Sequence, residues 1–280
     1  MSIKPVVIMG ATGTGKTKLS IDISKVIGGE VINADKMQIY AGLDITTNKI
    51  RPNDQGGIPH HLIGVISSIA DDVSVPSFRS IATTTAESIA RRGRVPVLVG
   101  GSNSLMHGFL ADHLDPSLAN PFLIPKYKPN LRFKSCLLWV HMHELVLNEY
   151  LCRRIDDMVA SGLVEELKEY FDTTLAHKIG NHTGLAKAIG VRELSKYFGG
   201  GMSLSDSIDE MKANTKALAK SQTTKIRHIA GVWGWPVCVV DSTEAIRCHL
   251  SGGDHSTEDI SWERDVSSPA IAIVDKFLHS

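Results

Sequence analysis

The chain has 280 residues, and its 30 Lys and Arg residues balance 30 Asp and Glu residues, so the formal net charge is zero. At roughly 150 residues per domain, that length allows one large domain or two smaller ones. The hydrophobic fraction of 42% excludes intrinsic disorder, and the zero net charge argues against a protein that binds nucleic acid through its overall charge.

Short apolar runs alternate along the chain with segments of helical periodicity. The predicted strands cover residues 6–9, 30–34, 95–99, 136–140 and 237–240. They are apolar almost throughout, as expected for a parallel sheet that helices cover on both faces. The sequence therefore predicts an α/β fold with a doubly wound parallel sheet.

The region from 145 to 230 contains no convincing strand, but it has two long helical periodicities, over 147–170 and 207–229. We interpret it as a helical insertion whose second helix returns the chain to the sheet. Residues 145–215 then form a small helical substrate domain, and residues 1–144 with 216–280 form the α/β core domain. The polar tail from 251 to 268 is expected to be loose, and residues 270–278 are expected to form a last helix.

The strongest motif lies between the first strand and the first helix. The run Gly10-Ala11-Thr12-Gly13-Thr14-Gly15-Lys16-Thr17 matches the phosphate-loop pattern G-x-x-x-x-G-K-[ST] in the required context. The glycines let successive backbone N–H groups point at phosphate oxygens, and the helix adds the positive end of its dipole. Lys16 supplies a cation, and the Thr17 hydroxyl suits a Mg²⁺ ion. All eight residues are candidate binding residues of a P-loop NTPase-like core.

A phosphate-loop enzyme also needs a carboxylate near the reacting group, and two predicted strands end in one, at Asp35 and Asp241. The carboxyl ends of parallel strands face the ligand crevice, and we expect the second strand to lie beside the first. Asp35 is therefore the better candidate. The alternative is that Asp35 only caps the turn that follows it.

Several segments, taken in order, resemble the isopentenyltransferases that prenylate N6 of adenine. They are residues 33–45, 47–49, 59–64, 93–96, 100–104, 154–158, 162–166, 188–191 and 218–222. The sequences Lys-Met-Gln at 36–38, Thr-Asn-Lys at 47–49 and Gly-Ser-Asn-Ser at 101–104 resemble the plant adenylate isopentenyltransferases more than the transfer-RNA enzymes.

The resemblance implies a transferase that moves a dimethylallyl group from dimethylallyl diphosphate to N6 of a free adenine nucleotide, the first step of cytokinin biosynthesis. It implies that the loop holds the donor's diphosphate, with Mg²⁺ at Thr17, and that Asp35 is the general base. The other implied residues are Lys16, Ser102, Lys220 and Arg227. Lys220 and Arg227 are expected to reach the diphosphate from the side opposite the loop.

Two residues depart from the family's pattern. Ser221 stands where Arg is usual, and His141 stands where the plant enzymes usually carry Asp. A charge-assisted contact contributes about 1.5–3 kcal/mol, so a weakly active paralogue is one alternative. The others are a transfer-RNA dimethylallyltransferase acting on an anticodon-loop adenosine, and a small-molecule P-loop kinase. Arg153 and Arg154 could each bind a substrate phosphate, or they could simply lie along the surface of their helix.

The expected partners are dimethylallyl diphosphate and ATP, ADP or AMP, with ATP and ADP preferred over AMP and transfer RNA less favoured. No apolar run approaches the ~20 residues of a membrane span, so no membrane partner is expected. We expect a monomer. Only five residues precede the first strand, and they do not form a signal or transit sequence. This predicts a cytoplasmic protein, or a plastid one if a transit peptide has been removed.

Overall fold

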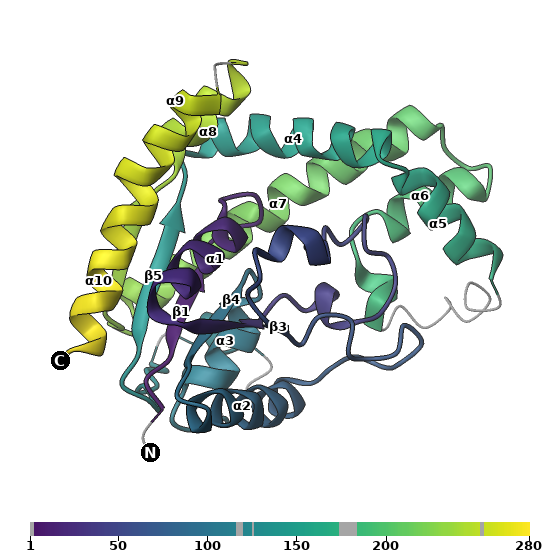
Figure 1. The fold of residues 1–280 in the computed structure, drawn as a ribbon. Coiled ribbons are helices and arrows are strands. Elements are labelled where there is room, and N and C mark those ends of the chain that lie inside the picture. Colours follow the sequence, from purple (N-terminus) through teal and green to yellow (C-terminus); the bar gives the residue numbers. More distant parts are fainter. Residues whose placement is uncertain (1–2, 116–119, 125, 174–183, 253–254) are drawn as a thin grey trace.

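A computed structural model describes residues 3–115, 120–124, 126–173, 184–252 and 255–280, and its centre is a parallel sheet (Figure 1). The sheet has the order β3-β2-β4-β1-β5-β6. Its strands are β1 (Val6–Met9), β2 (Gly29–Asn33), β3 (His60–His61), β4 (Val95–Gly100), β5 (Cys136–His141) and β6 (Val237–Asp241). The predicted fold class is confirmed, and all five predicted strands are present.

The sheet differs from the prediction in two ways. We expected the second strand beside the first, but β2 pairs with β4 and does not lie beside β1. The sheet also has the edge strand β3, which was not predicted because two residues are too few to show a pattern. His60 and His61 form this strand, and His61 Nε2 lies 2.7 Å from Glu30 Oε2.

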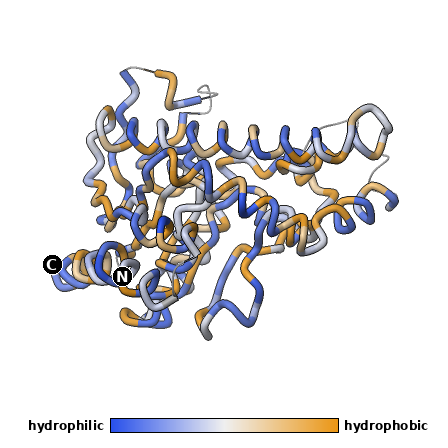
Figure 2. Tube along the Cα trace, turned by 90° about the horizontal axis from the view of Figure 1, so that it is seen from above, coloured by the Kyte–Doolittle hydropathy of each residue, from blue (hydrophilic) through white to orange (hydrophobic). Residues whose placement is uncertain are grey.

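Helices cover both faces of the sheet, as its apolar strands predicted. Val7 and Met9 of β1 pack on one face with α2 (Val75–Arg91) and α3 (Asn103–Leu110). Val6 and Ile8 point to the other face, which α1 (Lys16–Ile27) and α10 (Ser268–Leu278) cover. Hydrophobic and hydrophilic residues alternate along the helices in Figure 2, including the one that ends at the C-terminus. The strands β1, β2, β4, β5 and β6 each contribute to two cores through their period-2 alternation.

The inserted helices extend from the carboxyl edge of the sheet (Figure 1). They are α4 (Glu144–Ala160), α5 (Leu163–Asp172), α6 (Val191–Phe198) and α7 (Leu204–Gly231). The single helix expected over 147–170 is two helices, because Gly162 takes a left-handed φ of 100° between α4 and α5. Residues 174–183 of the predicted substrate domain lie outside the described residues, and the division into two domains stays a prediction.

The C-terminal tail is helical where we expected a loose segment. It comprises α8 (Thr243–Leu250), α9 (His255–Trp262), a π-helical turn (Glu263–Ser267) and the predicted last helix, α10. Polar residues dominate this tail because most of its side chains face water, while Trp262 and Val266 are buried against the sheet core. Among the described residues, no helix is long and apolar enough to span a membrane.

Short 3₁₀ turns connect several of these elements. They cover Met37–Ile39, Pro52–Gln55, Pro121–Leu123 and Gly184–Lys187. The first of them directly follows Asp35, so it forms part of the candidate site.

Candidate active site

The phosphate loop crosses the carboxyl end of β1 and enters α1 at Gly15. Gly13 and Gly15 have φ values of 87° and 88°, a left-handed conformation that favours glycine. At Gly10 a Cβ atom would lie 2.6 Å from Thr14 Oγ1 and 2.8 Å from the Val140 carbonyl oxygen, so only glycine fits. The three glycines of the motif are therefore required by the loop's own geometry.

Lys16 lies at the first position of α1, and its ammonium is folded back on the loop. Its Nζ donates to the Ala11 carbonyl oxygen at 2.7 Å. Burial lowers the pKa of Lys16 to about 8, against the attraction of Asp35, and the nearby Arg154 charge lowers it further. An anion bound in the loop would attract this ammonium. Thr17, the next residue, is exposed at the helix N-terminus.

Asp35 follows β2 and lies across from Lys16. Burial raises the pKa of its carboxyl, although Lys16 and the backbone N–H groups of Met37 and Gln38 act in the opposite direction. Its Oδ1 accepts the Met37 N–H at 3.1 Å, so Asp35 does cap the turn that follows it. Asp35 also lines both of the cavities described below. Ser102 Oγ accepts the Lys36 N–H at 2.9 Å, which fixes the chain directly after Asp35.

Arg154 of α4 provides a second cation, and the sequence alone had left its role open. Its Nη2 donates to Thr12 Oγ1 at 2.9 Å, and its Nε is buried without a partner. The neighbouring Arg153 turns away, since its Nη1 donates to the Leu250 carbonyl oxygen at 3.1 Å. An unpaired buried donor beside Thr12 is suited to an anionic ligand oxygen.

Gln222 of α7 fastens the phosphate loop to its surroundings. Its Oε1 accepts the Thr12 N–H at 2.8 Å, and its Nε2 donates to the Gly101 carbonyl oxygen at 3.0 Å. Asn103 Nδ2 in turn donates to the Gln222 carbonyl oxygen at 3.0 Å. One amide thus joins the loop after β1 to the loop after β4. Residue type alone did not reveal this function of Gln222.

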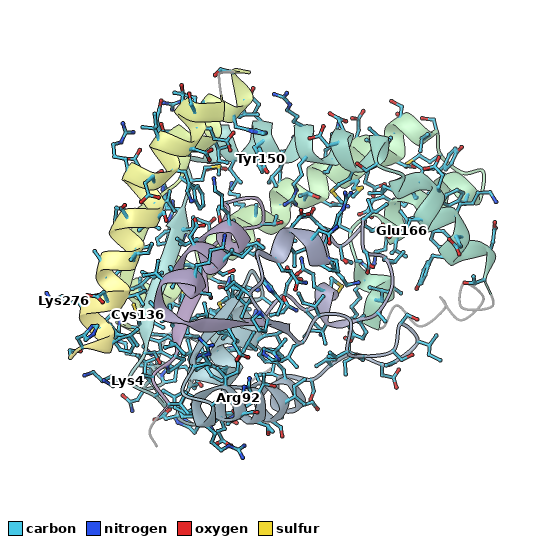
Figure 3. All side chains as sticks on the ribbon, viewed as in Figure 1. Lys4, Arg92, Cys136, Tyr150, Glu166 and Lys276 are labelled. Atoms are coloured by element: carbon cyan, nitrogen blue, oxygen red, sulfur yellow. The ribbon has the colours of Figure 1, made fainter. Side chains whose placement is uncertain are left out.

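Two cavities of about 300 Å³ each meet at the loop. The loop-side cavity is bordered by Gly13, Gly15, Lys16 and Thr17, and the helix-side cavity by apolar residues that include Ile155, Met158, Ile189, Met211 and Leu218. Five residues line both cavities: Thr12, Asp35, Gln38, Asn48 and Arg154. A charged ligand group on the loop and a flat apolar ring in the helix-side cavity would therefore meet beside Asp35. Tyr150 of α4, which is labelled in Figure 3, also lines the loop-side cavity.

Some predicted residues lie away from both cavities. Lys220, Ser221 and Arg227 are exposed on α7 and line neither cavity, whereas Gln222 and Leu218 of the same helix do. The arginine that lines both cavities is Arg154, whose Nη2 donates to Thr12 Oγ1 in the loop itself. The structure does not bring Lys220 and Arg227 together with the other site residues, so their role at the diphosphate stays a prediction.

His141 and Asp241 form a pair at the ends of β5 and β6. The distance between His141 Nδ1 and Asp241 Oδ2 is 2.9 Å, and Asp241 Oδ1 accepts the Thr243 N–H at 2.8 Å. Neither residue lines either cavity. Asp241 therefore caps a helix, and Asp35 is the strand-terminal carboxylate that faces the crevice.

The residues of the loop-side cavity fit a Mg²⁺ ion that arrives with its ligand. Among the described residues no three His, Cys, Asp or Glu side chains gather into a metal cluster, so the protein offers no cage of its own. It does offer the Thr17 hydroxyl, which lines this cavity. Mg²⁺ usually takes one or two protein oxygens and completes its shell with phosphate oxygens and water, so a single hydroxyl beside a bound diphosphate is consistent with a Mg²⁺ site.

The fold and the site together define a P-loop NTPase-like α/β protein whose phosphate loop faces a second, apolar cavity. The family model described as IPP transferase matches residues 38–122 and 116–229. The chain belongs to this isopentenyltransferase family, and it is a prenyltransferase.

Individual relatives agree with this assignment. An adenylate isopentenyltransferase of Humulus lupulus is 40% identical, over 97% of this chain and 89% of its own. Adenylate isopentenyltransferase 4 of Arabidopsis thaliana is 38% identical, over 98% of this chain and 92% of its own. Other relatives in that organism are named as chloroplastic or mitochondrial.

Solved structures are similar over the whole chain at lower identity. A eukaryotic dimethylallyltransferase acting on tRNA has a TM-score of 0.81 at 26% identity, covering 99% of this chain and 80% of its own. The full-length tRNA isopentenylpyrophosphate transferase of Bacillus halodurans has a TM-score of 0.74 at 27% identity, covering 99% of both chains.

Proposed function

We propose that this protein transfers a dimethylallyl group from dimethylallyl diphosphate to N6 of adenine in a free nucleotide, with ATP or ADP preferred over AMP. The observation that carries the proposal is the meeting of the two cavities at Asp35. The loop-side cavity suits the diphosphate, and the apolar helix-side cavity suits a purine ring. The family relationship supports the prenyl donor, and the named relatives support the nucleotide acceptor.

In the proposed reaction the bond between the donor's C1 and the diphosphate oxygen breaks, and a bond between C1 and adenine N6 forms. The pyrophosphate leaves with the bonding electrons. The loop N–H groups, Lys16 and Arg154 stabilise its charge. Bound Mg²⁺, held by Thr17 and the diphosphate, would add further positive charge to the leaving group.

Asp35 accepts the N6 proton as the new bond forms. The exocyclic amine is a weak nucleophile because its lone pair is delocalised into the ring, so a base within hydrogen-bond reach is needed. Burial raises the pKa of Asp35, which makes its carboxylate a stronger base than a carboxylate in water.

Transfer RNA is the second candidate acceptor, since the solved relatives are enzymes that act on tRNA. Two observations favour the free nucleotide. The two adenylate isopentenyltransferases are 40% and 38% identical to this chain, whereas the two solved tRNA enzymes are 26% and 27% identical to it. The chain also carries no net charge with which to bind RNA. Because the chain belongs to the isopentenyltransferase family, we no longer propose a small-molecule P-loop kinase.

The test is a parallel assay with purified protein, Mg²⁺ and dimethylallyl diphosphate, offered ATP, ADP, AMP or unmodified tRNA. We expect N6-prenylated ATP and ADP to form fastest, AMP more slowly and tRNA least. Prenylation of tRNA alone would overturn the acceptor that we propose. Absence of detectable product from every acceptor, with the fold intact, would instead support the weakly active paralogue.

A further inference from the structure

The C-terminal tail contacts the phosphate loop directly through Trp262. The residue ends α9 and leads into the π-helical turn, and its side chain is only 4% exposed. A Cβ atom on Gly15 would lie 2.6 Å from the Trp262 ring atoms Cη2 and Cζ3. The indole ring is therefore in contact with the residue at which the loop becomes α1.

The indole N–H fixes the same region from a second direction. Trp262 Nε1 donates to Asp22 Oδ2 at 2.8 Å, and Asp22 lies on the second turn of α1. Lys18 also lies over the ring, with its Nζ 5.0 Å from the centroid, and it forms an ion pair with Asp259 at 2.9 Å. That ion pair is exposed, so the ring contact and the Asp22 hydrogen bond hold α1 in place.

We propose that Trp262 is a positioning residue for the phosphate loop: its ring and its N–H hold Gly15 and α1 in the geometry that binds the donor's diphosphate. The inference rests on the function proposed above. The N–H groups at the start of α1 bind an anion only when they converge on it, and their direction depends on the orientation of the helix. Since Gly15 lacks a side chain, Trp262 is the packing partner that limits its movement.

The chain contains a matched control for this role. Trp235 is 5% exposed, and its Nε1 donates to the Pro129 carbonyl oxygen at the same distance of 2.8 Å. It belongs to the core on the other face of the sheet, away from α1. Replacing either tryptophan removes a buried indole and one hydrogen bond, but only one of them contacts the loop.

The experiment measures the binding of Mg²⁺ pyrophosphate and of AMP to each variant by calorimetry, together with the KM for dimethylallyl diphosphate. We expect Trp262→Leu to weaken pyrophosphate binding and raise the donor KM by roughly tenfold or more, because small misplacements of a binding group have large effects. AMP binding should not change. Trp262→Phe, which keeps a ring on Gly15, should recover much of the loss, and Trp235→Leu should bind pyrophosphate as the wild type does.

If Trp262→Leu does not fold, Asp22→Ala removes the same hydrogen bond from the α1 side, and it should also weaken pyrophosphate binding. Unchanged pyrophosphate affinity in folded Trp262→Leu, or an equal loss in Trp235→Leu, would overturn the inference. A wild-type protein that binds no pyrophosphate would instead refute the proposed function, and this inference with it.

Discussion

At the scale of single residues, the proposed chemistry depends on two oppositely charged groups whose pKa values move toward each other. Burial raises the pKa of Asp35 and lowers that of Lys16 to about 8. The raised pKa suits the proposed role of Asp35, because a general base works best near the operating pH, whereas the lowered pKa of Lys16 limits the pH range in which it is a cation. The two groups also stabilise each other's charged form.

Replacing Asp35 by Asn tests its role as the base with little structural change. The Asn side chain keeps an oxygen that can accept the Met37 N–H, but it cannot take a proton from N6. We expect kcat to fall by about 10²–10⁴, the usual contribution of a general base, with pyrophosphate affinity retained. Asp241→Asn is the control, since Asp241 caps α8 outside both cavities and should leave kcat unchanged. Near-normal turnover by Asp35→Asn would exclude Asp35 as the base.

Lys16 should determine the alkaline side of the pH profile. Below its pKa of about 8 the ammonium is protonated and binds the donor, and above that pH it loses its charge. The value of kcat/KM for the donor should therefore fall by about tenfold per pH unit above pH 8, because this parameter reports the free enzyme. The acid side should follow protonation of Asp35, so the profile should be bell-shaped. In Lys16→Arg the side chain stays charged throughout this range, so the fall in kcat/KM above pH 8 should disappear. If that fall persists in the variant, it is caused by the titration of another group.

At the scale of elements, the close approach of β4 to the chain after β2 sets the position of Asp35. A Cβ atom on Gly100 would lie 2.3 Å from the Ala34 carbonyl carbon and 2.8 Å from the Asp35 nitrogen. Both contacts are backbone atoms directly after β2, which cannot move aside as a flexible side chain can. Glycine at this position is therefore a requirement of the fold and of the site together.

Gly100→Ala should accordingly lower both stability and turnover. Overpacking of this kind costs about 1–3 kcal/mol in the free energy of unfolding, which urea titration measures. Gly231→Ala is the matched control: it ends α7, and a Cβ there meets no atom within 4 Å. That change should be neutral or should stabilise the protein by about 0.5–1 kcal/mol, since Ala favours helix. Equal effects from the two substitutions would contradict the steric argument.

The elements with a local sequence pattern were predicted correctly. The features that depend on tertiary packing were missed. The phosphate loop and Asp35 were found because a motif and a strand end place them directly. The break at Gly162 was missed because the apolar periodicity continues across it. Arg153 and Arg154 are indistinguishable by type, and only the packing of α4 turns Arg154 toward Thr12. The tail was expected to be loose because its two buried apolar residues, Trp262 and Val266, form too weak a pattern among polar ones.

At the scale of the whole molecule, the site is assembled from distant parts of the chain. The residues that line the two cavities come from the phosphate loop after β1, from Asp35 after β2, from Arg154 of α4 and from Gln222 of α7. Ligands that contact several of these elements bind the folded protein and not the unfolded chain. Ligand binding must therefore raise the stability of the whole molecule.

Pyrophosphate with Mg²⁺ should stabilise the protein more than pyrophosphate alone, because the described residues form no metal cluster and the ion must be held by the loop and the ligand together. At a concentration of about 100 times Kd the stabilisation is ~2.7 kcal/mol, which shifts Tm upward by several degrees. EDTA should remove most of that shift, and Thr17→Ala should reduce it, since Thr17 lines the loop-side cavity. AMP, expected in the helix-side cavity, serves as the control whose smaller shift should survive both treatments. A pyrophosphate shift that is indifferent to EDTA would mean that Lys16, Arg154 and the loop N–H groups bind the diphosphate without a metal ion.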